Sequence, residues 1–193
     1  LLGESKKGSH EGVLHRGCCG VRTAPGSWCC RKVPGRLLAC VRVSLVRRGL
    51  GGGEPLLRRE ATPAVMARTK ALGMEGILTT NGTLLGPELR EQMLRDSWDE
   101  VHFSVDGPTP EIHDRLRGVP GAFKRTVQAA CRLSVGRRQR GMSVPRVALH
   151  FVINSENYHT LSDMIRLAHA VGAERVDFDA LIAYCPDYAE GYN

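Results

Sequence analysis

A run of glycines followed by an acid is the stretch of the sequence best suited to hold a ligand. The stretch is GLGGGEPLL, residues 49–57, in which Gly52, Gly53, Glu54 and Pro55 follow one another. Glycines let a backbone approach a ligand closely, because they carry no side chain. A carboxylate directly after them can accept hydrogen bonds from a cationic group held against that backbone. The order of these residues therefore indicates a site for a ligand with a positively charged nitrogen.

Three further polar motifs follow apolar runs along the chain. They are Asn81 and Gly82 in TNG, Ser104 and Asp106 in SVDG, and Asn154 and Asn157 in INSEN. Taken singly, each motif is also a common turn sequence, since Asn, Asp, Gly and Ser all favour turns. Taken together and in order, they favour a shared role over a series of incidental turns.

The elements that must position these motifs alternate between strands and helices. Short apolar runs predict strands at 75–80, 100–105, 145–153 and 174–182, preceded by one drawn from the region of 39–46. Periodicity and end signals predict helices at 62–73, 86–97, 121–135 and 159–172, with a loop at 106–111. This alternation predicts an α/β fold with a parallel sheet, either an open doubly wound sheet or an incomplete (β/α) barrel.

Two of the predicted helices carry specific expectations. Thr62 is expected to cap the first, with Pro63 at its first position and Gly73 as its stop. The helix at 159–172 is expected to bury Leu161, Ile165 and Ala168 on one face.

All four motifs fall at the carboxyl ends of predicted strands. In barrels and open α/β sheets alike, that edge is where ligands bind, because the strand-to-helix loops converge there. We therefore expect the motifs to meet in one cleft.

The first 50 residues differ in composition from the rest. They hold ten Lys or Arg and two acids, so the chain's net charge of +7 belongs to this segment, and five of the seven cysteines also lie there. A basic arm for nucleic acid is one interpretation. Because no periodic pattern organises these charges, a disordered or out-of-frame leader is the preferred one. The expected divisions are a leader at 1–50, an α/β domain at 51–182 and a tail at 183–193.

No apolar run approaches the roughly 18 residues of a membrane span, and the opening residues lack the apolar region of a secretory signal. The expected location is therefore cytoplasmic, where thiols stay reduced.

The motifs GGGEPLL, ILTTNGTLL and VHFSVDGPTPEIHDRLRG, with GAF shortly after, resemble the core of radical S-adenosylmethionine (radical SAM) enzymes. The resemblance covers about residues 50–182 and is greatest to the SPASM-type branch, whose members often modify peptides or proteins. It implies a partial (β/α) barrel that binds S-adenosylmethionine (SAM) and a [4Fe–4S] cluster. It also implies an oxidoreductase that acts by hydrogen abstraction and needs an electron donor.

The resemblance also implies roles for individual residues. The glycine-rich motif, Gly52 to Pro55, would lie beside the methionyl amino group, with Glu54 or its neighbouring carbonyls as acceptors. The residues expected to line the rest of the pocket are Asn81, Gly82, Ser104 and Asp106, with Arg117 against the cofactor carboxylate and Asn154 and Asn157 near the ribose.

The cysteines depart from the family pattern. The family holds its cluster with three cysteines spaced C-x3-C-x2-C, and no such spacing occurs in this chain. We therefore assign no metal ligands and expect the chain as written to be inactive, truncated before any C-terminal domain, and weak in binding SAM. The alternatives are a non-catalytic nucleotide-binding α/β module and a basic nucleic-acid-binding protein, although nucleic acid is not the expected partner. The substrate is open, with a peptide or protein suggested by the branch alone.

Overall fold

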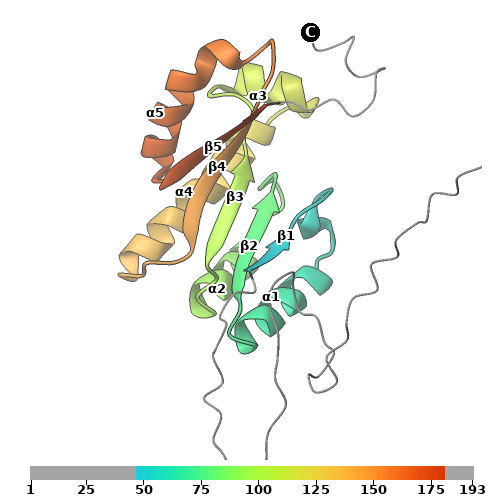
Figure 1. The fold of residues 1–193 in the computed structure, drawn as a ribbon, viewed down its shortest axis with the longest axis vertical. Helices are drawn as coiled ribbons and strands as arrows, with labels where there is room; N and C mark the ends of the chain where they lie inside the picture. The colour runs from blue at the N-terminus through green and yellow to red at the C-terminus, as the bar shows by residue number, and fades with distance from the viewer. Residues whose placement is uncertain (1–46, 181–193) are drawn as a thin grey trace, which may run out of the picture. The chain divides into compact units, whose positions relative to one another are not determined.

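The computed structural model describes residues 47–180, which belong to one compact unit beginning at Arg47 (Figure 1). Five strands form a single sheet: β1 (Arg47–Leu50), β2 (Glu75–Thr80), β3 (Glu100–Ser104), β4 (Arg146–Ile153) and β5 (Arg175–Ala180). The spatial order of the strands equals their order in the chain, and each neighbouring pair is parallel. The predicted α/β class is confirmed.

The strand order also decides between the two architectures left open by the sequence. A doubly wound sheet reverses its strand order at a switch point, which places helices on both faces. Here the order never reverses, and parallel crossovers share one hand, so successive helices fall on one face. The result is a partial (β/α) barrel with one covered face and one open face.

The helices connect the strands in the expected alternation. They are η1 (Pro55–Leu57), α1 (Ala61–Ala71), α2 (Pro87–Arg95), α3 (Pro110–Arg117), α4 (Ala122–Gln139), η2 (Tyr158–Thr160) and α5 (Leu161–Val171). In Figure 1, α4 passes behind β3 and β4, which it also contacts. Among these described helices, none is both long and apolar enough to cross a membrane.

The covered face of the sheet carries the core. Alternate side chains of the central strands are buried there, namely Leu78, Val101, Phe103, Val147, Leu149 and Phe151. They pack in one cluster with helical side chains that include Met93, Leu133 and Met164. Burying a side chain of this size contributes about 1.5–3 kcal/mol, so the period-2 alternation fixes which face meets the helices.

Several sequence expectations were wrong in detail. Thr62 does not cap α1: it lies inside the helix, and its hydroxyl donates to the carbonyl of Pro55 at 2.6 Å. Ile165 is 58% exposed, because α5 buries Met164, Ala168 and Val171 instead. The strand predicted from the region of 39–46 is described at Arg47–Leu50 as β1, while residues 1–46 lie outside the described part.

Helix α3 was not predicted, because residues 106–111 were interpreted as a loop. It begins at Pro110, and its Asp114 carboxylate accepts from the amides of Gly121 and Phe123 at 2.6 and 2.7 Å. These backbone bonds lower the pKa of Asp114. Asp114 thereby caps α4, whose own N-cap residue, Gly121, has no side chain to do so.

A tight packing contact lies at the amino end of the sheet. Trp98 is 1% exposed, and a Cβ placed on Gly76 of β2 would lie 2.1 Å from its ring. The indole nitrogen also donates to the carbonyl of Glu100 at 2.9 Å, which prevents the ring from moving aside without loss. Gly76 is therefore needed for space.

Replacing Gly76 with alanine is expected to lower the free energy of unfolding by about 1–3 kcal/mol, since the added methyl group overpacks the Trp98 ring. Urea unfolding followed by tryptophan fluorescence measures this. Gly49→Ala in β1 is the matched control, because no atom lies within 4 Å of a Cβ there. Equal stability of the two variants would contradict the packing argument.

Candidate functional site

The predicted site residues line the carboxyl edge of the sheet. Glu54 follows β1, Asn81 follows β2, Ser104 ends β3, and Asn154 follows β4. The strand register places Thr80 beside Phe103 and Ser104 beside His150, so these positions are neighbours across the strands. The structure therefore brings the four motifs to the same edge.

The glycine-rich loop has a backbone that few other residues would accept. Gly52 and Gly53 have φ angles of +87° and +57°, and both are exposed. No heavy atom lies within 4 Å of a Cβ at either position. Two consecutive positive φ angles favour glycine strongly, and the space beside the loop leaves its backbone accessible to a ligand.

The Glu54 carboxylate joins this loop to the end of β2. Its Oε1 accepts from the Leu56 amide at 2.9 Å and from the Thr80 hydroxyl at 2.8 Å, and its Oε2 accepts from the Asn81 amide at 2.7 Å. Three donors of the protein thus share the carboxylate. A cationic ligand group would meet the carbonyls of the glycine loop more readily than this side chain.

The loop after β2 is held by its own side chains and by α4. The Asn81 side-chain oxygen accepts from the Thr83 amide and hydroxyl at 2.9 and 2.7 Å. The Asn81 carbonyl accepts from the Thr126 hydroxyl at 2.5 Å. Gly82 is buried against Phe103, to whose Cδ1 a Cβ would approach within 2.8 Å. This loop is therefore fixed before any ligand arrives.

Asp106 and Arg117 form an ion pair beyond the end of β3. Arg117 Nε lies 2.6 Å from Asp106 Oδ2, and the Asp106 side chain is 12% exposed. The Asp106 amide donates to Nδ1 of His113 at 3.1 Å, and His113 is 2% exposed. Burial, together with the charge of Arg117, lowers the pKa of His113, so the ring is neutral with Nδ1 as acceptor.

Asn154 and Asn157 differ in their positions. Asn157 is fully buried, and its amide nitrogen donates to the carbonyls of Asp106 and Val152. Its oxygen accepts from the Asn154 amide at 2.7 Å. Asn157 therefore positions the loop after β4, whereas half-buried Asn154 lies at the edge, with its oxygen on the Glu156 amide.

The open face of the sheet carries a charge network below this edge. Glu100 is 2% exposed and lies 2.6 Å from Arg175, 3.2 Å from Arg146 and 3.0 Å from His102. Burial would raise the pKa of Glu100, but the hydrogen bonds from His102 and Arg146 outweigh it and the pKa falls. The bond to Asp177 at 2.6 Å raises the pKa of Arg175. These five residues are named the lower network.

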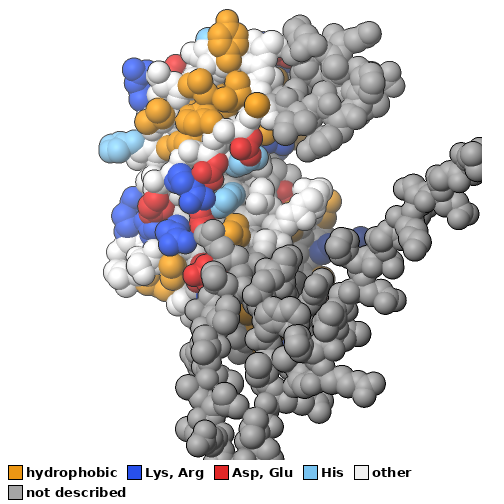
Figure 2. Space-filling view, viewed as in Figure 1, with side chains coloured by type: hydrophobic (Ala, Val, Ile, Leu, Met, Phe, Trp, Pro, Cys, Tyr) orange, Lys and Arg blue, Asp and Glu red, His pale blue; other side chains and the backbone are white. Residues whose placement is uncertain are grey.

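Figure 2 shows basic, acidic and histidine side chains gathered together on the side of the sheet turned to the viewer. The structure also has a groove of about 450 Å³ between η1, α1 and α2, with arginines at positions 58, 59 and 95 among its lining residues. None of the predicted site residues lines it. These site residues at the carboxyl edge, named the edge row, are therefore separate from the groove.

The described residues do not fit a [4Fe–4S] cluster. Within residues 47–180, no group of three or more His, Cys, Asp or Glu side chains could hold a metal ion. Cys131, the cysteine within that range, is a half-buried residue of α4. The other six cysteines lie outside the described residues, so the expectations about them are not tested by this structure.

Sequence reasoning missed the residues that support the edge row. Thr80, His113 and Thr126 each bond to a motif residue or its neighbour. Thr80 adjoins a motif and could have been considered for that reason. Nothing in the sequence around His113 or Thr126 indicates that their side chains return to an earlier loop.

Comparisons with known proteins agree with the geometry. The family model described as the Radical SAM superfamily matches residues 41–168. An AdoMet-dependent heme synthase of Methanosarcina barkeri is 33% identical over 64% of this chain and 33% of that protein. A PqqA peptide cyclase of Xanthomonas campestris is 30% identical over 70% of this chain and 34% of that protein.

Among solved structures, Streptococcus suis SuiB bound to S-adenosylmethionine has a TM-score of 0.61 at 15% identity. The alignment covers 72% of this chain and 31% of SuiB. SuiB bound to the precursor peptide SuiA has a TM-score of 0.58 at 16% identity, with 69% and 28% covered. The chain spans about a third of the length of the curated relatives it matches.

Replacing Glu54 with glutamine is expected to lower the free energy of unfolding by about 1–3 kcal/mol. The amide group cannot accept from all three donors, and at least one is left without its partner. Amide hydrogen exchange at Asn81 should become faster. Glu60→Gln is the control, because Glu60 is exposed and makes no side-chain cap bond. An unchanged exchange rate at Asn81 in Glu54→Gln would refute the role of the Glu54 carboxylate in joining the two loops.

His113 is expected to make stability depend on pH. Its pKa in the folded chain lies below its ordinary value of 6.5, so the unfolded chain binds more protons and stability falls as pH falls through 6.5. For one group the slope is at most about 1.4 kcal/mol per pH unit. His113→Asn should lose less stability than the parent between about pH 7.5 and 5.5.

Thermal unfolding at the two pH values measures this difference. His159→Asn is the control, since it makes the same substitution at an exposed histidine. An unaltered pH dependence in His113→Asn would show that His113 is not the group responsible.

Proposed function

Because the chain belongs to the radical SAM superfamily, we propose that its partial barrel is the SAM-binding core of an oxidoreductase that removes a hydrogen atom from a peptide. Membership implies SAM and a [4Fe–4S] cluster as the cofactors. Together, these cofactors supply a carbon-centred radical able to abstract hydrogen. The residues of this chain then have to bind SAM, orient it and admit the substrate.

The observation that carries the proposal is the convergence of the motifs at the carboxyl edge. In this proposal the carbonyls of Gly52 and Gly53 accept from the SAM ammonium, while Glu54 and Pro55 fix the loop that presents them. Two consecutive carbonyl groups next to open space suit a cation with several N–H donors.

The remaining motif residues complete the proposed pocket. Asn81 and Gly82 form its wall beside the loop, and the hydroxyl of Ser104 meets a polar group of SAM. Arg117 meets the SAM carboxylate from its place beside Asp106, and Asn154 lies near the ribose. The ion pair with Asp106 uses Nε of Arg117 and orients the guanidinium.

The cluster is treated separately, because the described residues do not fit it and the sequence lacks the C-x3-C-x2-C spacing. We derive no step through it. The proposal is that this polypeptide on its own binds SAM without generating a radical, and that an electron donor is a partner only of a form that holds the cluster. A cytoplasmic location belongs to the same proposal, since cluster thiolates must stay reduced.

A peptide is the proposed substrate. Two proteins similar to this chain are named for peptides: the PqqA peptide cyclase, and SuiB in its structure with the precursor peptide SuiA. The other relative reported is named for heme, as an AdoMet-dependent heme synthase.

SAM added to the full chain without iron is expected to bind with a dissociation constant between high micromolar and millimolar, about 4–6 kcal/mol. Only hydrogen bonds in a wet cleft would hold it, each contributing about 1–3 kcal/mol before ordering costs. Calorimetry gives the affinity. Amide chemical shifts should move at Gly53, Asn81 and Ser104 and stay constant at the amino-edge residues Met74 and Asp99.

Shifts confined to the amino edge, or scattered over both edges, would overturn the assignment of the pocket. A sub-micromolar affinity without iron would instead favour the non-catalytic nucleotide-binding module, because the protein alone would then have preorganised the site.

A further inference from the structure

The polar side chains on the open face divide into two groups with different partners. In the lower network each arginine, Arg146 and Arg175, has a carboxylate partner. Above it lie His150 and Asp179, whose Nε2 and Oδ2 atoms are 2.6 Å apart. The register pairs His150 with Asp177, yet its bond goes to Asp179, one pleat nearer the carboxyl edge. The imidazole therefore leans toward that edge and away from the lower network.

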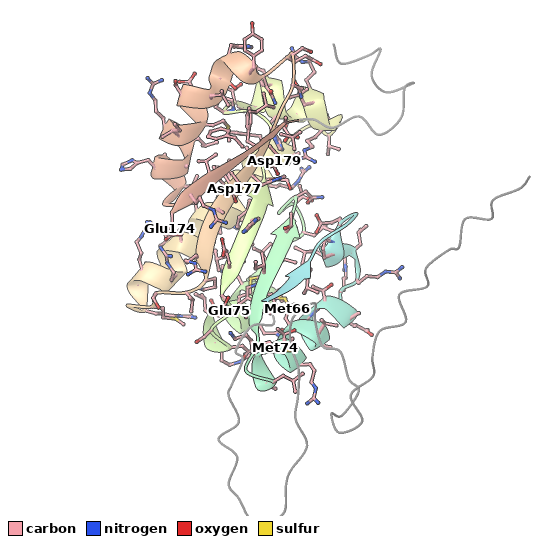
Figure 3. The ribbon with its side chains drawn as sticks, in the orientation of Figure 1. Met66, Met74, Glu75, Glu174, Asp177 and Asp179 are labelled. Atoms are coloured by element: carbon pink, nitrogen blue, oxygen red, sulfur yellow. The ribbon has the colours of Figure 1, made fainter. Side chains whose placement is uncertain are left out.

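The two aspartates of β5 differ in their neutralising charge. Asp177 binds Arg175 through both carboxylate oxygens, at 2.6 and 3.1 Å, and its side chain is 30% exposed. Asp179 is 66% exposed, and His150 is its partner among the described residues. Figure 3 labels both aspartates along β5, on the side of the sheet turned to the viewer. Asp179 thus has an imidazole as its partner and no described guanidinium.

Two other charged groups of the sheet have ionic partners. Arg117 pairs with Asp106, and Glu100 is shared by two arginines of the lower network. The upper part of the open face therefore presents a carboxylate to any molecule entering from the edge. Such a site attracts ammonium and amide N–H groups and repels carboxylates.

His150 also lies next to a residue of the proposed cofactor pocket, and Asp179 lies one strand further on. Ser104 on β3 is in register with His150 on β4, and neighbouring strands are about 4.8 Å apart. A substrate must approach the cofactor closely to lose an atom to it. The open face of β4 and β5 below Asn154 is therefore available for the substrate, while the β1 and β2 side holds the glycine loop.

We propose that Asp179, held in place by His150, binds a nitrogen donor of the substrate and selects a peptide carrying ammonium or amide N–H groups over a polycarboxylate. This inference rests on the proposed function and names the substrate chemistry of the same site. It separates the peptide class from heme-type compounds, whose carboxylate side chains Asp179 would repel. Asp179 is the binding residue, and His150 is the positioning residue.

The test compares two short peptides that differ in one charge. The full chain, labelled with ¹⁵N and free of SAM, is titrated at low salt with Ac-Gly-Lys-Gly-NH2 and with Ac-Gly-Glu-Gly-NH2. The amide of Val152, in register with Asp179, reports binding by chemical shift. The lysine peptide should bind about fivefold more tightly than the glutamate peptide, as one exposed ion pair permits.

Asp179→Asn should reduce this preference to about twofold or less, because the amide keeps the shape of the side chain and removes its charge. Asp163→Asn is the matched control. Asp163 is an exposed acid on α5 that pairs with Arg166, so its loss should leave the preference intact.

Equal binding of the two peptides, no binding of either, or an unchanged preference in Asp179→Asn would overturn the inference. SAM is absent from these titrations, so their outcome does not depend on SAM binding. A failure of the SAM titration would count against the proposed function alone.

Discussion

The site depends first on the carboxylate of Glu54. It accepts from one amide in its own loop, from the hydroxyl of Thr80 and from the amide of Asn81. Without these bonds, the loop after β1 would rest on two glycines in left-handed conformations, which cost glycine little but fix nothing. The hydrogen bonds of Glu54 thus hold the flexible glycine loop in one conformation and set its distance from the loop after β2.

The uniform strand order explains why one face of the sheet can serve chemistry while the other serves stability. The covered face buries apolar side chains of β2, β3 and β4 against the helices. The open face is then left with polar side chains such as His102, Ser104 and His150 at half burial. Polar groups at that depth need partners. The lower network supplies these partners at the amino end, while the His150–Asp179 pair and the edge row lie nearer the carboxyl edge.

Much of this arrangement could be predicted from the sequence. Alternating strands and helices gave the α/β class, and motif positions after apolar runs gave the carboxyl edge, because both follow from local patterns. The strand order could not be derived, since it depends on crossover geometry that no local pattern records. The resemblance supplied the barrel instead. The carboxylate role of Glu54 was anticipated only in part: it is an acceptor, but for three groups of the protein.

The features that the sequence did not predict are helix α3, the buried face of α5, and the contacts of His113 and Thr126. α3 begins with a proline and follows another, at Pro108 and Pro110, so the local signal was that of a turn. The burial of Met164 in place of Ile165 is a rotation of α5 that only its packing partners determine. His113 and Thr126 reach positions separated from them by 7 and 45 residues, and single-sequence periodicity carries no information on such contacts.

The small side chain of Ala148 allows the lower network to connect three strands of the sheet. Ala148 lies between His102 and Arg175 in the register, and its small side chain lets Arg175 of β5 pass over β4 to reach Glu100 of β3. The Arg175–Glu100 ion pair therefore connects β5 to β3 across β4. A slip of β4 by one residue would turn a larger side chain into its path and move His150 to the covered face. The ion pair between Arg175 and Glu100 thus helps to maintain the register of His150 with Ser104, although both charged groups lie nearer the amino end of the sheet.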